Sequence, residues 1–399
     1  MLRVLFVDDD IPNLHAMQRH FGGYADGWEA AFVPGADVAL FVMSERPVHA
    51  VVVSSGLSEM SAASFLRLTR ERHPATARIA LAGPGDRGHS PRTLAVANRR
   101  LSADCGPEVL FGEVRRVAGI QHRLYGDATR RLVRSVGALP SPPTVVMALD
   151  AALGEEDCSP AEVADIVSGD VAIVANVLKL VNSAYFGLRA EVHDLRQAVA
   201  YLGVEALRDL AIAGALFRAF APGTDLSPEW LDCFNAHAAQ VAGLASQMVP
   251  PPLRAEAHVA GMLHGIGELV VAERSPDRLA EVAADIAAGA TPDEAEERQL
   301  GTTYPVVGGY LLSSWGMGYN LVEAVTSQRR LYLGHPRPAE LADVIRVADD
   351  LVARLPATEG CQPPVCQASS VQPLVDGYAE RVGLGPEAGA ATGGMANGQ

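Results

Sequence analysis

The chain has 399 residues, of which 49% are hydrophobic and 6% aromatic, and its formal net charge at pH 7 is −15. A chain of this length and apolar content is expected to fold as two or three domains with aliphatic cores. Its negative charge disfavours a general surface for nucleic acid or anionic membranes. The sequence contains no run of about 18 apolar residues and no signal-peptide pattern, so we expect a cytoplasmic protein that neither inserts into membranes nor binds nucleic acid.

Apolar runs that are typical of buried strands alternate with amphipathic runs over residues 1–120. The predicted strands cover residues 4–7, 31–33, 51–55, 79–82 and 100–102. The predicted helices lie near residues 12–20, 36–45, 61–72, 91–98 and 107–118. This alternation predicts an α/β domain with a doubly wound parallel sheet and helices on both faces.

An acidic cluster, Asp8, Asp9 and Asp10, directly follows the first predicted strand. Functional groups of a parallel sheet gather at the carboxyl ends of its strands. These carboxylates suit Mg²⁺, which takes oxygen ligands. The same residues also suit a polar loop that caps the following helix, and spacing alone does not separate the two interpretations.

Short motifs occur in a characteristic order along these strands. FVDDD follows the first strand, VVVSS forms the third, IALAG the fourth and RLSAD the fifth. This order resembles a response-regulator receiver domain, which has a flavodoxin-like fold, over residues 1–120. The resemblance implies a phosphate-accepting Asp after the third strand, a Thr or Ser after the fourth and a Lys after the fifth. These positions hold Ser55, Ala82 and Ala103, and no Asp occurs from residue 38 to 85.

Each replacement removes a different part of the receiver chemistry. Acyl-phosphate formation needs a carboxylate nucleophile, which Ser55 lacks, and Ala82 offers no hydroxyl and Ala103 no cation. The resemblance therefore implies a pseudo-receiver domain that acts as an interaction or dimerisation surface without aspartyl phosphorylation. Asp8 and Asp9 are retained, so weak Mg²⁺ binding could persist there without a role in phosphorylation.

Residues 121–138 are predicted to form a linker. Apolar residues recur at helical spacing between 108 and 137 among six arginines, which predicts one helix that leaves the first domain. The arginines could contact phosphate-bearing ligands, but a solvated helix face is the more common arrangement. Gly137 and the segment LPSPPT then indicate the end of the helix and a rigid turn.

Residues 139–355 have a nearly continuous helical pattern. The segment SPAE, which begins at Ser159, is a capping box with proline at the first helical position. Further helices are predicted around Val174–Val181, around His237, and over residues 195–203, 205–220, 257–269, 280–289, 293–301, 304–316, 320–330 and 338–355. Residues 356–399 are of low complexity and expected to be disordered, so truncation after residue 385 should leave folding intact.

Three potential metal ligands lie on predicted helices of this region. His237 opens the segment HAAQVAGLA, His264 lies in AHVAGMLHGIGEL, and Asp349 lies in VIRVADDLV. A histidine, a His-Asp doublet and a distant aspartate would form a divalent-metal site for phosphoester hydrolysis. Here the second residue of the doublet is Gly265, which has no side chain to hold a metal or a bridging water.

The segments DVAIVANVLKLVNSAYFGL and LRQAVAYLGVEALRDL are followed by AGMLHGIGELV and LGTTYPVVGGYLLSSWGMGYNLVEAV. This order resembles an HDOD domain, an HD-related output domain of bacterial signalling proteins, over residues 139–355. The resemblance implies an all-α fold that is usually non-hydrolytic. The HD and HD-GYP phosphohydrolases share its core.

Carried over residue by residue, the resemblance separates retained positions from lost ones. Three HD positions keep a ligand-type residue: His237, His264 and Asp349. Four positions have lost one: Gly265 at the aspartate of the doublet, Tyr304 at an additional histidine of HD-GYP enzymes, and Gln328 and Arg329 at their later histidine pair. Because the doublet acid is missing, we expect no metal cofactor and no catalytic residue, with the histidines satisfied by hydrogen bonds.

The two resemblances together imply a non-catalytic signalling adaptor that acts by protein–protein contact in two-component or cyclic-di-GMP networks. Its expected partners are other signalling proteins, such as a sensor kinase or a diguanylate cyclase, and a homodimer is compatible with the sequence. Two alternatives remain: a metal-dependent phosphohydrolase or phosphodiesterase of the HD type, and a cyclic-di-nucleotide sensor that binds without hydrolysis. Gly265 argues against the enzyme, and binding of cyclic-di-GMP would identify the sensor.

Overall fold

The structure is a computed structural model. It describes residues 2–21, 28–58, 60–83, 96–135, 147–149, 151–152, 159–168, 174, 177–178, 192, 195–204, 207–211, 228–329 and 341–353. The chain divides into two compact units, Met1–Arg130 and Arg131–Gln399. The boundary between the two units falls inside the predicted linker at residues 121–138.

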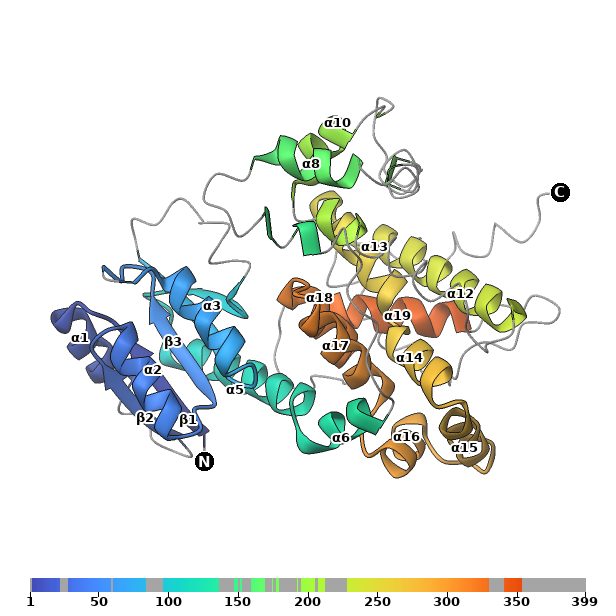
Figure 1. Cartoon of the computed structure of the whole chain (residues 1–399), viewed down its shortest axis with the longest axis horizontal. Helices are drawn as coiled ribbons and strands as arrows, with labels where there is room; N and C mark the ends of the chain where they lie inside the picture. Colours follow the sequence, from blue (N-terminus) through green and yellow to red (C-terminus); the bar gives the residue numbers. More distant parts are fainter. Residues whose placement is uncertain are drawn as a thin grey trace, which may run out of the picture. The chain divides into compact units, whose positions relative to one another are not determined.

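The first unit contains a five-stranded parallel sheet (Figure 1). Its strands are β1 (Leu2–Val7), β2 (Trp28–Val33), β3 (Ala50–Ser54), β4 (Ala77–Ala82) and β5 (Arg99–Ser102). They lie in the order β2-β1-β3-β4-β5, which is the order of flavodoxin-like doubly wound sheets. The predicted parallel α/β sheet is therefore confirmed.

Helices cover both faces of this sheet, which explains why its strands are apolar throughout. On one face, α2 (Ala36–Glu45) and α3 (Ala62–Arg72) pack against side chains of β1 and β3. On the other face, α1 (Ile11–Phe21) and α5 (Pro107–Leu124) contribute Phe21 and Phe111, whose ring centroids lie 6.4 Å apart. Phe6 of β1 stacks on Phe21 at 5.4 Å and joins this second face to the sheet.

The helix predicted between residues 108 and 137 is interrupted. α5 ends before Gly126, and α6 (Asp127–Ser135) follows it. A Cβ atom at position 126 would lie 2.8 Å from a backbone oxygen of α5. The hydroxyl of Thr129 donates to the carbonyl oxygen of Arg123 at 2.8 Å and satisfies a backbone acceptor at the end of α5. The prediction of one continuous helix is therefore wrong, because the glycine and this side-chain cap stop it.

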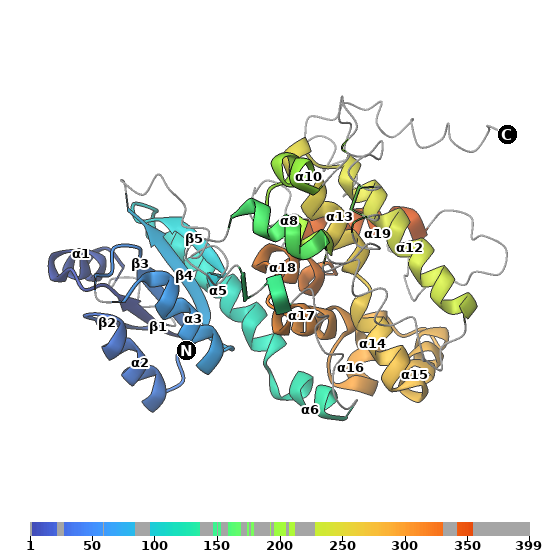
Figure 2. The ribbon, with the colours of Figure 1, turned by 45° about the horizontal axis from the view of Figure 1, so that its top comes forward.

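The described residues of the second unit are organised in helices (Figure 2). These are α8 (Pro160–Ser168), α10 (Leu195–Leu202), α12 (Pro228–Gln247), a 3-10 turn (Pro251–Leu253), α13 (Arg254–Leu263), α14 (Ile266–Arg274), α15 (Pro276–Ala287), α16 (Pro292–Leu300), α17 (Tyr304–Ser314), α18 (Tyr319–Ser327) and α19 (Leu341–Ala353). α12 packs against α13 and α19, and α17 packs against α14 and α18. The predicted all-helical character of this region is confirmed for the residues that are described.

Helix ends and helix crossings in this unit follow from a few residues. The predicted capping box at α8 is present, with the Ser159 amide donating to Glu162 at 2.6 Å and the Glu162 amide donating to the Ser159 hydroxyl at 3.3 Å. Gly267 lets α14 approach α17 closely, since a Cβ atom there would lie 2.0 Å from the carbonyl oxygen of Tyr304.

Several predicted elements fall mainly outside the described residues. These are the helices at 91–98, at Val174–Val181 and over 205–220, together with the tail at 356–399. Among the helices that are described, none combines the length and the apolar character that a membrane crossing requires.

Candidate functional site

The predicted receiver positions lie together at the carboxyl edge of the sheet. Asp8 and Asp9 follow β1, Ser55 follows β3, Ala82 is the last residue of β4, and Ala103 follows β5. The amide of Ala103 donates to the carbonyl oxygen of Ala82 at 2.8 Å, so these two strand ends are direct neighbours. The edge therefore holds two carboxylates, a serine hydroxyl and two methyl groups.

Protein groups already donate to both acids at this edge. Asp8 is buried and accepts hydrogen bonds from the backbone amide of Asp10 at 2.9 Å and from the side-chain amide of Asn13. Asp9 accepts from the backbone amide and the hydroxyl of Ser58, at 2.5 and 2.6 Å. The capping interpretation fits only Asp10, whose carboxylate accepts from the backbone amide of Asn13 in the first turn of α1 at 3.4 Å.

A second group of predicted residues converges inside the helical unit. α12 supplies His237, the turn between α13 and α14 supplies His264, and α19 supplies Asp349. One ligand atom from each residue lies within 4.8 Å of the other two. Nε2 of His237 lies 2.9 Å, and Nε2 of His264 3.5 Å, from the same Oδ1 atom of Asp349.

The local fold explains how the two histidines are presented. His237 lies in the middle of α12, so the sequence-based helix start at this residue is wrong, and the helix begins at Pro228. His264 belongs to the short turn between α13 and α14, where its Nδ1 lies 2.6 Å from the carbonyl oxygen of Gly261. A carbonyl oxygen only accepts, so Nδ1 carries the proton and Nε2 faces Asp349.

Burial destabilises the charged forms of the side chains at this centre, and their mutual hydrogen bonds and opposite charges offset that effect. Burial acts to raise the pKa of Asp349, but hydrogen bonds from His237 and His264 outweigh it and hold that pKa well below its ordinary value. Burial acts to lower the pKa of His264, but Asp349 and the Gly261 carbonyl more than compensate and leave it raised. An ionised carboxylate thus faces Nε2 of His264, and either a proton or a metal cation satisfies that arrangement.

Gly265, at the position predicted for the doublet acid, lies against an aromatic ring. A Cβ atom at Gly265 would lie 2.9 and 3.1 Å from two ring carbons of Phe234. Phe234 is buried, and its ring stacks on that of Trp230 at 5.3 Å. The backbone of Gly265 is ordinary, with φ −91° and ψ 3°, so a side chain here would conflict with the Phe234 ring, which would have to shift, and not with the backbone.

Residues 139–331, which include this centre apart from Asp349, match the model of the HDOD domain family. The chain contains an HDOD domain. A Treponema pallidum protein of uncharacterised function is 26% identical over 206 residues, and the match covers 51% of this chain and 39% of that protein. The chain therefore spans well under half the length of this relative.

Two solved structures resemble the chain over a similar share. An HDOD domain protein of unknown function from Geobacter sulfurreducens is 23% identical, with a TM-score of 0.49, over 66% of this chain and 90% of that one. A protein from Shewanella amazonensis that is provisionally named a phosphohydrolase is 26% identical, with a TM-score of 0.48, over 65% of this chain and 90% of that one.

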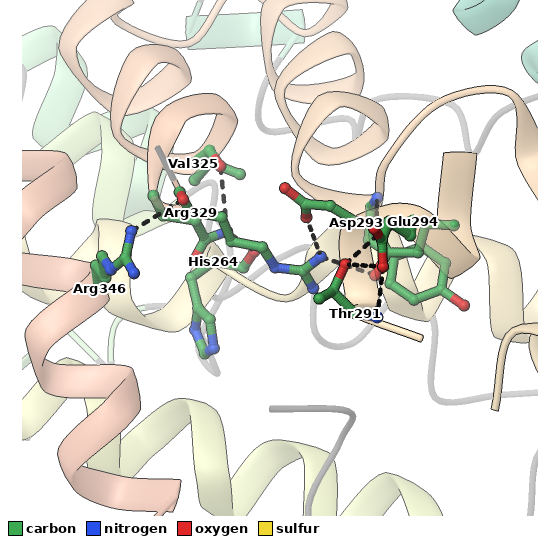
Figure 3. A network of polar contacts seen from close by, with 10 residues as sticks. His264, Thr291, Asp293, Glu294, Val325, Arg329 and Arg346 are labelled. Carbon is green, nitrogen blue, oxygen red and sulfur yellow. Dashed lines mark hydrogen bonds and ion pairs between the residues drawn. The ribbon is translucent and has the colours of Figure 1, made fainter. Parts of the chain in front are cut away.

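Three of the positions at which a ligand-type residue was predicted to be lost make structural contacts. The side-chain amide of Gln328 donates to the carbonyl oxygen of His264 at 2.8 Å. Arg329 reaches away from the centre to Asp293 at 3.1 Å and to the buried Glu296 at 2.8 Å (Figure 3). Glu296 also accepts from the backbone amide of Tyr304 at 2.8 Å. These substitutions tie α16, α17 and α18 together.

Glu268 of α14 is a residue of this neighbourhood that the sequence analysis missed. The residue is only 7% exposed. Burial raises the pKa of Glu268 to about 7, while the charges of Arg329 and His264 act against that rise. An acid inside the apolar run GIGELVVA was the signal that could have identified it.

The HD-related fold implies a divalent metal at the centre, and the residues present fit one. Two imidazoles and one carboxylate are a donor set for Zn²⁺ and similar ions, and three protein ligands leave a position open. Ligating histidines commonly donate their other N–H to a carbonyl oxygen, as His264 does to Gly261. A metal bound there would act as a Lewis acid and lower the pKa of a bound water.

Proposed function

We propose that the chain is a cytoplasmic, non-catalytic signalling adaptor in two-component or cyclic-di-GMP networks. A pseudo-receiver domain and the HDOD domain would act by contact with other signalling proteins, such as a sensor kinase or a diguanylate cyclase. The position of Phe234 carries this proposal, since a Cβ atom at Gly265 would lie 2.9 Å from its ring. Hydrolysis by an HD-type centre needs the acid of the doublet, and the Cβ atom of such an acid would meet a buried aromatic ring.

The first unit supports the same conclusion. Its strand order is that of flavodoxin-like sheets, and the receiver positions meet at one edge. The acceptor position there is Ser55, which lacks the carboxylate needed for an acyl phosphate. Asp9, one of the two retained acids, is engaged by Ser58. A domain with the scaffold but without the acceptor suits contact better than phosphotransfer.

Two assays on the purified full chain test the absence of chemistry. Incubation with acetyl phosphate and Mg²⁺ should give no aspartyl phosphate by intact mass, and incubation with cyclic-di-GMP and Mn²⁺ should give no turnover. Stoichiometric labelling of an Asp would overturn the pseudo-receiver. Partners would be found by cross-linking in cells, and the proposal requires that an identified signalling protein then bind the purified chain.

A second candidate is a metal-dependent phosphohydrolase of the HD type. The convergence of His237, His264 and Asp349 within 4.8 Å favours it, whereas Gly265 opposes it. Turnover of a phosphodiester that His264→Ala abolishes would establish this candidate. A third, the cyclic-di-nucleotide sensor, predicts that calorimetry detects tight binding of cyclic-di-GMP with no product formed.

A further inference from the structure

The outer face of α2 carries large apolar side chains that the core of the first unit does not use. Phe41 is 66% exposed and Val38 is 40% exposed. The opposite face of the same helix supplies Ala36, Ala39 and Met43 to the core beneath it. A helix that covers a sheet normally carries polar residues on its outer face, so α2 departs from that pattern.

The helix α3, which covers the same core as α2, shows the usual pattern (Figure 1). The exposed side chains along it include Arg67, Glu71 and Arg72. Packing against this sheet therefore does not require an apolar outer face. Exposed apolar side chains that gather on one helix face are typical of a surface that contacts another protein.

Charged side chains of opposite sign lie at the two ends of this face. Asp37 is in the first turn of α2, and Arg46 directly follows the last residue of the helix. Both are exposed, and neither makes an ion pair within the part of the chain that the structure describes. Ser44, on the same side of the helix as Phe41, can be covered without leaving an unpaired donor, because its hydroxyl donates to the carbonyl oxygen of Phe41 at 2.7 Å.

The spacing of these residues makes the face complementary to itself. Asp37 and Arg46 lie equally far along the chain from the midpoint of α2, which Phe41 adjoins. A second copy of α2, packed antiparallel across a two-fold axis at that midpoint, places each Asp37 opposite Arg46 of the other copy and brings the two Phe41 rings together. Antiparallel packing also sets opposite ends of the two helix dipoles side by side.

We propose that the protein self-associates through α2 as a two-fold symmetric dimer, with Phe41 at the centre of the contact and an Asp37–Arg46 ion pair on either side. Val38 faces Glu45 of the second copy at the rim of the contact, where charged residues are common. One short helix from each copy buries little surface, so the dimer belongs to the weak class of interfaces. The inference goes beyond the adaptor proposal, which concerns contacts with other signalling proteins.

The test is sedimentation velocity of the full-length protein between about 1 µM and about 1 mM, the range in which a weak dimer dissociates. The variants are Phe41→Ser, and Asp37→Arg and Arg46→Asp, alone and combined. Val109→Ser is the matched control, since Val109 of α5 is 52% exposed on the same unit. Both charge reversals oppose the helix dipole and should lower the melting temperature slightly, so association is measured well below the melting transition.

The wild type should pass from monomer to dimer within this range. Phe41→Ser should weaken association at least about 10-fold, as the loss of an aromatic anchor does. Each single charge reversal should weaken association, because it places like charges opposite each other. The combined reversal should restore association, because the two ion pairs form again with their signs exchanged. Val109→Ser should match the wild type.

Three results would contradict the inference. Wild-type protein that stays monomeric at the highest concentration would exclude the dimer. A dimer that Phe41→Ser leaves unchanged, or that the combined reversal does not restore, would exclude α2 as the contact. Oligomers that keep growing with concentration would exclude a closed two-fold arrangement. None of these results bears on the binding of another signalling protein, so the adaptor proposal would stand or fall separately.

Discussion

At the residue scale, the contact between Phe234 and Gly265 disfavours an acidic side chain next to His264. We expect Gly265→Asp to destabilise the second unit by about 1–3 kcal/mol, the usual cost of overpacking, because its Cβ atom would lie 2.9 Å from the ring of Phe234. Urea unfolding measures this cost.

A double-mutant cycle identifies the cause of that cost. In a Phe234→Ala background, the added cost of Gly265→Asp should become smaller, since the two positions are in contact and should couple. The same cost in both backgrounds would show that the ring does not exclude the acid.

His258 is a buried residue of α13 that makes stability depend on pH. Burial lowers the pKa of His258 from 6.5 to about 4, and its Nδ1 lies 3.3 Å from the hydroxyl of Ser246. As pH falls, the imidazole of His258 is therefore protonated in the unfolded chain at a higher pH than in the folded protein. The free energy of unfolding therefore falls by a total of about 3 kcal/mol as pH is lowered from 6.5 to about 4, and this contribution of His258 is fully present above pH 6.5.

Unfolding by urea at several pH values would measure this effect. The slope of stability against pH between 6.5 and about 4 should flatten in His258→Gln, whatever that variant's absolute stability. An unchanged slope would assign the pH dependence to other groups. Glu268 contributes with the opposite sign, since its raised pKa favours the folded state at low pH.

At the scale of elements, Gly267 holds α14 and α17 together by its lack of a side chain. We expect Gly267→Ala to destabilise the second unit strongly, because the added Cβ would meet the Tyr304 carbonyl oxygen at 2.0 Å and the Gly308 amide nitrogen at 2.6 Å. Thermal unfolding checks this expectation. Gly119→Ala on α5 is the control, since nothing lies within 4 Å there, and the better helix propensity of alanine should stabilise by up to about 1 kcal/mol.

The elements themselves could largely be read from local patterns. Strand β3 is an uninterrupted apolar run, and the capping box of α8 is a four-residue signal, so both were predicted. The stop at Gly126 was missed, because apolar spacing continued across it and the deciding bond from Thr129 depends on how the chain turns. Periodicity reports which face is buried but not where two helices replace one.

Only part of the candidate site could be predicted from the sequence. His237 and Asp349 are 112 residues apart and were found by residue type and order, but their 2.9 Å contact is a property of helix packing. Phe234 was missed, because only the fold brings it against Gly265. Glu268 was missed although an acid inside an apolar run is visible in the sequence.

At the scale of the whole molecule, the chain consists of two compact units with cores of their own. We expect calorimetry of the full chain to show two transitions, because a domain with its own core unfolds as a unit. Phe65→Ala, in the core of the first unit, should lower one transition only, with a cost of about 3–5 kcal/mol. His258→Gln should move only the other at pH 5, and one transition shifted by both substitutions would contradict this independence.

Phe234 and Gly265 also constrain the evolutionary routes open to this chain. A direct change of Gly265 to aspartate places a charged side chain against a buried ring, and prior loss of the ring leaves a cavity in the core. Either order passes through a less stable intermediate. The two positions therefore have to change together if an acid is to be placed at residue 265 without a loss of stability on the way.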